Sequence, residues 1–164
     1  MRLVVEWARL NVEQGTGGPF GAGVFDMDSG RLIAAGVNRV VQLNDSTAHA
    51  EMLAIAGAQQ SLSSFDLGSA GLPRCELVTS CEPCAMCFGA IPWSGIRSLV
   101  CGATAADAQR IGFDEGPRHP DWIAQLEMRE IRVMSGVCRS DAARVLADYH
   151  AGNGLIYNGR RQAD

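Results

Sequence analysis

Apolar side chains recur at helical spacing over residues 3–14, which predicts a packing helix at the start of the chain. A glycine-rich stretch, residues 15–19, ends this helix. Two short apolar runs, residues 20–25 and 31–36, flank an Asp-Ser-Gly turn and predict a β-hairpin. The chain is therefore expected to open with one helix and two antiparallel strands.

The remainder of the chain alternates between helix-like and strand-like segments. The run 47–60, rich in Ala, Met, Leu and Ile, follows three N-cap candidates and predicts a helix. Residues 120–128 show no decisive pattern. The alternation indicates an α/β layer architecture, and the opening hairpin makes its sheet mixed rather than wholly parallel. Further strands are expected over residues 75–80, 97–102 and 130–134, and further helices over 84–90, 103–110 and 140–150.

Length and charge narrow the classes of function. At 164 residues the chain is expected to form one domain with a core of its own. All 14 basic residues are Arg, and 18 acidic residues leave a net charge of −4, which argues against a nucleic-acid partner. The absence of Lys excludes a Walker P-loop, a protein kinase and a pyridoxal-phosphate Schiff base.

The apolar runs and the cysteines indicate the compartment. No run approaches the roughly 18 residues of a membrane span. Charged residues interrupt the N-terminal segment, which is unlike a signal peptide. We therefore expect a cytoplasmic protein without a membrane partner. Its six cysteines should then be reduced, and three of them cluster at Cys81, Cys84 and Cys87, which suggests a metal before a disulfide.

His49, Cys84 and Cys87 are the candidate metal ligands. Cys84 and Cys87 are three residues apart at the start of a predicted helix, so one turn brings both sulfurs to a common point. The helix N-terminus favours their thiolate form. Three protein ligands and a water are typical of catalytic zinc, whereas a structural site has four. Glu51, two residues beyond His49, is then a proton carrier that does not ligate the metal.

Other readings of these residues stay open at this point. An isolated Cys-x-x-Cys is also found in half of a zinc knuckle or in a redox pair. Cys81 is a candidate fourth ligand that would close the site. A structural zinc site, however, gives no role to Glu51.

The order His-Ala-Glu at 49–51 followed by Pro-Cys-Ala-Met-Cys at 83–87 is the zinc deaminase pattern. Around it the chain resembles the cytidine deaminase superfamily, and more specifically the bacterial guanine deaminases. The Ser80-Cys81 step before Glu-Pro-Cys favours that branch over the tRNA adenosine deaminases. The resemblance covers about residues 15–116 and includes Gly-Pro-Phe-Gly-Ala at 18–22, residues 44–51 and 79–87, and Gly-Phe-Asp at 112–114.

This resemblance implies a fold and a reaction. The fold is a three-layer αβα sandwich around a five-stranded mixed sheet, with residues 1–164 forming a single zinc-dependent deaminase domain. The reaction is the hydrolysis of guanine to xanthine and ammonia with one Zn²⁺ per subunit, and Glu51 shuttles the protons. Members are often homodimers, and the tail, about residues 151–164, is a candidate for exchange between subunits.

The resemblance also implies a set of residues that recognise the base. Asn38 would bind the purine through its amide, and Phe20 and Trp93 would form an aromatic pocket. Glu115, the acid after Gly-Phe-Asp, would accept hydrogen bonds from adjacent N–H groups and serve as a second proton carrier. An aromatic residue of the tail would reach the base, with Tyr157 the better candidate and Tyr149 the other.

Two departures from the family leave the substrate open. The acid at position 115 is often Asp in the family but is Glu here, and the tail runs on beyond Tyr157. A longer acid and another tail widen the choice to amino-triazines such as ammeline. Cytosine and tRNA adenosine are further alternatives, although the net charge of −4 disfavours tRNA. The rival of another class is a zinc-binding module without catalysis, in which Glu51 is dispensable.

Overall fold

The hairpin at the start of the sheet is built from residues that tolerate close packing and tight turns. The structure is a computed structural model that describes residues 1–158. β1 (Gly21–Asp26) and β2 (Leu32–Val37) pair antiparallel, as the sequence predicts. Asp26 accepts hydrogen bonds from the Asp28 N–H and the Ser29 hydroxyl, which shapes the connecting turn.

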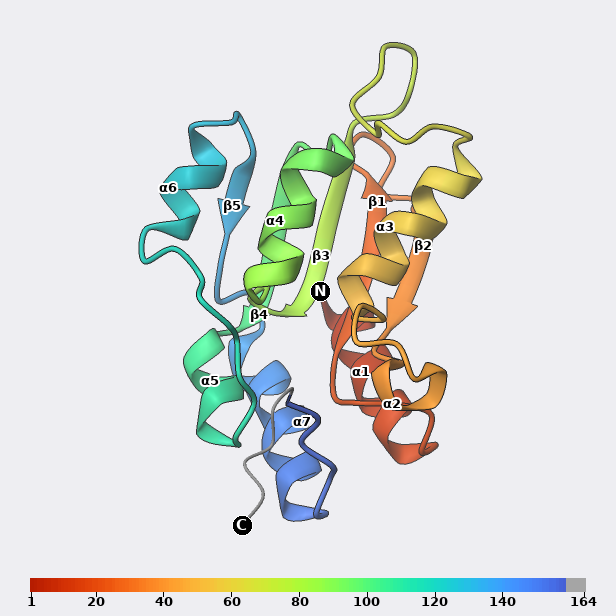
Figure 1. Ribbon diagram of the computed structural model, residues 1–164. Coiled ribbons are helices and arrows are strands. Elements are labelled where there is room, and N and C mark those ends of the chain that lie inside the picture. The colour runs from red at the N-terminus through yellow and green to blue at the C-terminus, as the bar shows by residue number, and fades with distance from the viewer. Residues whose placement is uncertain (159–164) are drawn as a thin grey trace.

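Five strands form one mixed sheet in the order β2-β1-β3-β4-β5 (Figure 1). β1 also pairs antiparallel with β3 (Cys75–Cys81). β3, β4 (Ser98–Ala103) and β5 (Arg132–Met134) run parallel to one another. The predicted mixed sheet is thereby confirmed.

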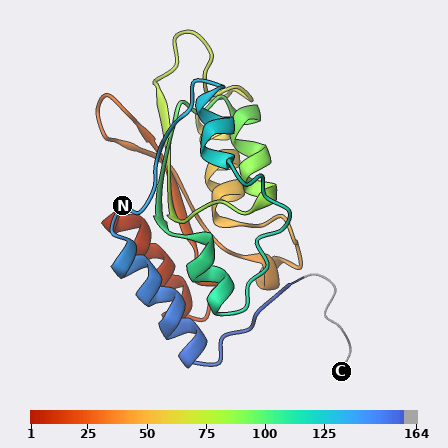
Figure 2. The same cartoon turned by 90° about the vertical axis from the view of Figure 1, so that its left-hand side faces the viewer.

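Helices cover both faces of the sheet, as Figure 2 shows edge-on. Alternate residues of the parallel strands explain why. Leu77 and Leu99 belong to the core beneath one helical layer, whereas Val78 and Val100 belong to a second cluster on the opposite face. The first layer contains α3 (Ala50–Ser61), α4 (Ala85–Ser94) and α6 (Trp122–Glu127), and the second α1 (Arg2–Glu13) and α7 (Arg139–Ala151). The three-layer αβα prediction is confirmed.

Two short helices stand where the sequence pattern is weak. The undecided stretch 120–128 contains α6, whose Trp122 and Leu126 are buried in the main core. α2 (Val40–Leu43) was not expected, because it is a single turn with no buried residue. α5 (Ala105–Arg110) agrees with the prediction, and a capping box between Thr104 and Asp107 begins it.

Over the described part of the chain, no helix is long and apolar enough to span a membrane.

A close contact between β2 and α3 positions the His49 side of the site. A Cβ on Gly36 of β2 would lie 2.2 Å from the carbonyl oxygen of Ala50. Only glycine therefore allows α3 to lie directly on the hairpin. This contact holds the N-terminus of α3, and with it His49, against the sheet at the end where β3 leads into α4.

Candidate zinc site and substrate pocket

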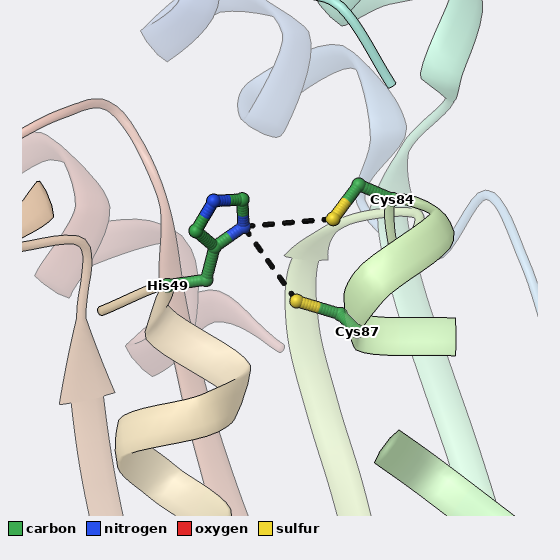
Figure 3. A group of neighbouring side chains, drawn as sticks. All are labelled: His49, Cys84 and Cys87. Atoms are coloured by element: carbon green, nitrogen blue, oxygen red, sulfur yellow. Dashed lines mark hydrogen bonds between the residues drawn. The ribbon is translucent and has the colours of Figure 1, made fainter. Parts of the chain in front are cut away.

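Two helix N-termini converge on the candidate metal centre (Figure 3). His49 is the N-cap residue of α3 and Cys84 the N-cap residue of α4, both with extended backbone conformation. Neither side chain caps its own helix. His49 Nδ1 instead faces the sulfurs of Cys84 and Cys87, at 3.6 Å from each.

The spacing of these atoms fits zinc. The three ligand atoms lie within 4.8 Å of one another. Tetrahedral zinc, with bonds of about 2.3 Å to sulfur and about 2.05 Å to nitrogen, separates a sulfur from a nitrogen by about 3.6 Å. The observed nitrogen–sulfur distances of 3.6 Å match this value. A donor set of one imidazole and two thiols also suits zinc better than magnesium or calcium.

The protonation of the two thiols is unequal in the protein alone. A hydrogen bond from Cys87 and the neighbouring His49 lower the pKa of Cys84 to about 4, against the opposing effect of burial. The hydrogen bond to Cys84 and burial raise the pKa of Cys87. The hydrogen bond and His49 therefore favour the thiolate form of Cys84, which is the form that binds metal.

Cys81 lies outside the ligand group. The described residues contain one metal-competent group, and it consists of His49, Cys84 and Cys87. The Cys81 thiol points instead to the carbonyl oxygen of Thr104, at 3.5 Å, and packs in an apolar cluster. Three protein ligands leave one coordination position for water or substrate, which is the catalytic arrangement.

Glu51 stands beside this centre. It is in the first turn of α3, is buried, and lines the same pocket as His49 and Cys84. Burial raises the pKa of Glu51, and the negative charge of Cys84 adds to the effect. A buried carboxyl group with a raised pKa next to a metal-bound water is suited to carry protons.

A partly open pocket lies beside the candidate metal ligands. Its aromatic wall is a chain of edge-to-face contacts in which Phe113 lies 5.0 Å from both Phe20 and Tyr157, measured between ring centroids. Flat walls of this kind suit a planar heterocycle. The pocket is lined by Phe20, Gly21, Asn38, His49, Glu51, Thr79, Ser80, Cys81, Glu82, Cys84, Phe113, Asp114, Glu115, Tyr157 and Asn158.

Asn38 presents an unpartnered donor to this pocket. Its side chain is 1% exposed, and Nδ2 has no hydrogen-bond partner among the described residues. Oδ1 accepts a hydrogen bond from the Val40 N–H at 3.3 Å, and Asn11 binds the backbone oxygen of Asn38 at 2.9 Å. These contacts fix the amide plane and leave Nδ2 free to donate to a bound molecule.

Glu115 faces the same pocket from the loop after α5. It is 7% exposed, and burial together with the charges of Cys84 and Glu51 raises its pKa to about 8. Among the described residues no group donates a hydrogen bond to its carboxylate. A bound molecule with N–H groups would supply the missing donors and stabilise the carboxylate form.

The tail sends Tyr157, not Tyr149, into the pocket. The Tyr157 hydroxyl is buried without a partner among the described residues, and a Cβ on Gly18 would lie 2.2 Å from it. Tyr149 donates its hydroxyl to the Leu155 carbonyl at 2.6 Å and does not line the pocket. In this structure Tyr157 enters the pocket of its own chain, and the part of the tail at 159–164 lies outside the described residues.

The expectation that Trp93 lines the pocket is corrected by the structure. Trp93 is 87% exposed and borders two other surface hollows, one of them with Phe65. The pocket lies at the N-terminus of α4, whereas Trp93 is nine residues after Cys84, about 13 Å further along the helix axis. The aromatic partner that sequence reasoning passed over is Phe113, within the Gly-Phe-Asp stretch.

Other residues that line the pocket were indicated weakly or not at all by the sequence pattern. Thr79 and Ser80 lie near the end of the buried strand β3, just before Cys84, so the sequence pattern could have placed them at the site. Asn158 carried no signal, because it lies in an irregular tail far from the motif.

Comparison with known proteins identifies the family. The model of the cytidine and deoxycytidylate deaminase zinc-binding region matches residues 1–103, which include the whole ligand set. The chain belongs to this family. It is accordingly a zinc-dependent aminohydrolase, and His49, Cys84 and Cys87 form a group that could hold its metal.

Individual relatives narrow the comparison. The guanine deaminase of Bacillus subtilis is 42% identical over 115 residues, which is 70% of this chain and 69% of the relative. The solved structure of guanine deaminase from Nitrosomonas europaea is 54% identical with a TM-score of 0.89, covering 92% of this chain and 82% of that one. A tRNA-specific adenosine deaminase of Agrobacterium fabrum is 36% identical over 80% of this chain and 79% of the relative.

Proposed function

We propose that this protein is a guanine deaminase that converts guanine and water to xanthine and ammonia. The observation that carries the proposal is a pair of groups, Asn38 Nδ2 and the Glu115 carboxylate, that have no hydrogen-bond partner within residues 1–158 and line an aromatic-walled pocket beside the candidate metal ligands. Guanine offers ring and carbonyl acceptors for the amide and adjacent N–H donors for the acid. Neutral cytosine and adenine do not have a ring N–H next to their amino group.

The relatives support the same substrate class. A solved structure 55% identical to this chain, with a TM-score of 0.91, holds 2,6-diaminopurine, and one 54% identical holds 8-azaguanine. Both ligands are purine-like bases without a sugar. The match to guanine deaminases is also closer in identity than the match to the tRNA deaminase, at 54% against 36%.

In this proposal His49, Cys84 and Cys87 would hold zinc, which would supply Lewis-acid activation of water. Glu51 takes one proton from the attacking water and delivers it to a ring nitrogen, and the second water proton passes through Glu51 to the leaving amine, with Glu115 as a second carrier. The bond from the guanine C2 carbon to the amino nitrogen breaks, a bond from that carbon to oxygen forms, and no redox change occurs. Asn38 and Glu115 hold the base so that C2 faces the water, and Phe20, Phe113 and Tyr157 exclude solvent.

The test is ammonia release from a panel of guanine, ammeline, cytosine, adenine, their nucleosides and a tRNA anticodon stem-loop. We expect the highest kcat/KM with guanine. A preference for ammeline would move the assignment to amino-triazines, and a preference for the stem-loop would overturn it. Ammonia release that is absent with every substrate from zinc-loaded protein would favour the non-catalytic module.

We further propose that the protein is a homodimer. Support comes from the family resemblance and from Phe65 and Trp93, each 87% exposed beside a common hollow, since apolar area of this kind is often covered by a partner. Light scattering after size exclusion should give twice the monomer mass of 17.5 kDa. Exchange of the tail between subunits is a separate proposal: mixing a Glu51→Gln chain with a Tyr157→Ala chain should restore activity only if Tyr157 acts across subunits.

A further inference from the structure

The loop that carries Glu115, residues 112–118, joins α5 to the segment before α6. Gly112 and Gly116 adopt positive φ angles of 103° and 69°. Within the loop the Gly116 N–H donates to the Asp114 carboxylate at 2.8 Å, and the Arg118 N–H donates to the Gly116 carbonyl at 2.8 Å. The Glu115 carboxylate receives no hydrogen bond from the described residues. Its position must therefore be set through the backbone of the loop.

Contacts from outside the loop hold its first half. The Asn158 amide spans the loop: Nδ2 donates to the Gly112 carbonyl at 2.8 Å, and Oδ1 accepts from the Asp114 N–H at 3.0 Å. The Ala85 N–H at the start of α4 donates to the Glu115 carbonyl at 2.9 Å. The loop is thus fixed to the tail on one side and to the metal-binding helix on the other.

Arg118 holds the second half. Its guanidinium donates to the Pro83 carbonyl at 3.3 Å and to the Glu82 carboxylate at 3.2 Å, and it lies 4.7 Å from the centre of the Trp122 ring. Pro83 and Glu82 immediately precede the ligand Cys84. Arg118 therefore joins the Glu115 loop to the metal-binding segment.

Glu82 is a suitable anchor for this contact because it is itself restrained. Its carboxylate also accepts the Ser135 hydroxyl at 2.8 Å and the Ala105 N–H at 3.1 Å. The Arg118–Glu82 ion pair is largely buried, with side chains 16% and 11% exposed. A buried, hydrogen-bonded pair of this kind defines geometry better than a surface pair does.

We propose that Arg118 and Asn158 are positioning residues for Glu115, which together set the distance between its carboxylate and the metal ligands. The inference rests on the proposed function in assigning Glu115 to base recognition. Neither side chain needs to react: Arg118 acts through the loop backbone, and so does Asn158. A displacement of about 1 Å in a group that orients the substrate can cost about 100-fold in rate.

The kinetic test compares Arg118→Ala, Arg118→Lys and Asn158→Ala with Arg74→Ala. Arg74 is a matched control because its guanidinium pairs with the Asp28 carboxylate just before β3 begins, at the opposite end of that strand from Glu82. We expect kcat/KM for guanine to fall about 10- to 100-fold in the two alanine variants of the loop anchors and less in Arg118→Lys. Zinc content should stay at one per chain in all of them. Parent-like kinetics, or loss of zinc from both Arg118 variants, would overturn the proposal.

A double-mutant cycle separates positioning from general damage. If Arg118 acts through Glu115, then Arg118→Ala should cost less than about 2-fold in a Glu115→Gln background. If the two losses multiply, Arg118 does not act through Glu115 and the inference is wrong.

Amide hydrogen exchange tests the same point without a substrate. The Asp114 and Ala85 N–H groups are donors in the contacts described above. Their exchange should be faster in Asn158→Ala and Arg118→Ala than in the parent or in Arg74→Ala. Unchanged exchange would overturn the inference. A parent enzyme inactive on guanine would refute the proposed function, while the exchange result would still judge the role of the two anchors.

Discussion

Replacing Glu115 by Gln tests the recognition of the base most directly. The substitution keeps the size of the side chain but replaces one oxygen by a donor. Glu115 is buried, and the described chain offers its carboxylate no hydrogen-bond donor, which leaves its oxygens available to N–H groups of a bound base. In Glu115→Gln an amide donor would face a substrate donor.

The magnitude follows from that geometry. A hydrogen bond to a charged group contributes about 1.5–3 kcal/mol, which corresponds to roughly 10- to 150-fold in affinity or rate. Glu115 is expected to form such a bond and also to carry a proton for the leaving amine, which adds a share of the usual acid–base contribution. We therefore expect kcat/KM on guanine to fall by about 100-fold or more, with zinc content unchanged.

The assay follows ammonia and xanthine under zinc-replete conditions, with Glu115→Asp as the conservative comparison. Asp keeps the acceptor and shortens the side chain by one methylene, so this variant should retain much more activity, with a changed ratio of guanine to ammeline turnover. If both variants behave like the parent, Glu115 is only a loop carboxylate, and the guanine assignment loses its main local support.

Three further predictions concern the metal centre and the fold. Glu51→Gln should lower turnover at least about 100-fold with zinc retained, by metal analysis, and near-normal turnover would refute its role as proton carrier. Cys84→Ala should lose zinc and activity together, whereas Cys81→Ala should keep most of the zinc; a metal-free Cys81→Ala would show a closed four-ligand site. The hydrogen bond from Arg139 lowers the pKa of Asp107. The ionised Asp107 therefore contributes to the free energy of unfolding above the ordinary Asp pKa of about 3.9, and this contribution is lost as the pH falls toward the lowered pKa. Asp107→Asn should thus cost about 1–2 kcal/mol at pH 7 in denaturant unfolding, the deficit should shrink as the pH falls below about 3.9, and a deficit as large at pH 2 as at pH 7 would contradict this.

The layers of the fold were predictable because each rests on a local pattern. The hairpin, the parallel strands and the long helices have apolar runs of the right period, bounded by glycine or proline. α2 and α6 were not predictable in this way. Both are too short for a periodic signal, and α6 is held by burial of Trp122 and Leu126 rather than by its own propensity.

The pocket was only partly predictable for a different reason. Asn38, Glu51 and Glu115 lie next to turns and helix ends that the motif itself defines, so their convergence follows from the order of elements. The prediction that Trp93 lines the pocket was wrong because Trp93 lies near the C-terminus of α4, several turns away from the N-terminus that faces the pocket. Asn158 was not predicted because its hydrogen bond to Gly112 joins residues 46 positions apart, and no local sequence pattern indicates such a contact.

The metal ligands also explain an apparent defect in the helices that carry them. An N-cap residue normally accepts a hydrogen bond from the first turn, and its absence costs about 1 kcal/mol. His49 and Cys84 occupy N-cap positions without a side-chain cap, and their side chains turn toward each other instead. The positive ends of α3 and α4 are thereby directed at one point, where they favour the Cys84 thiolate. The two helices are thus less stable at their starts than ordinary capping would make them, and the same geometry brings one imidazole and two thiols together as candidate zinc ligands. The local rule of helix capping is therefore broken at the two residues whose side chains form part of the candidate metal site, as is common at functional sites.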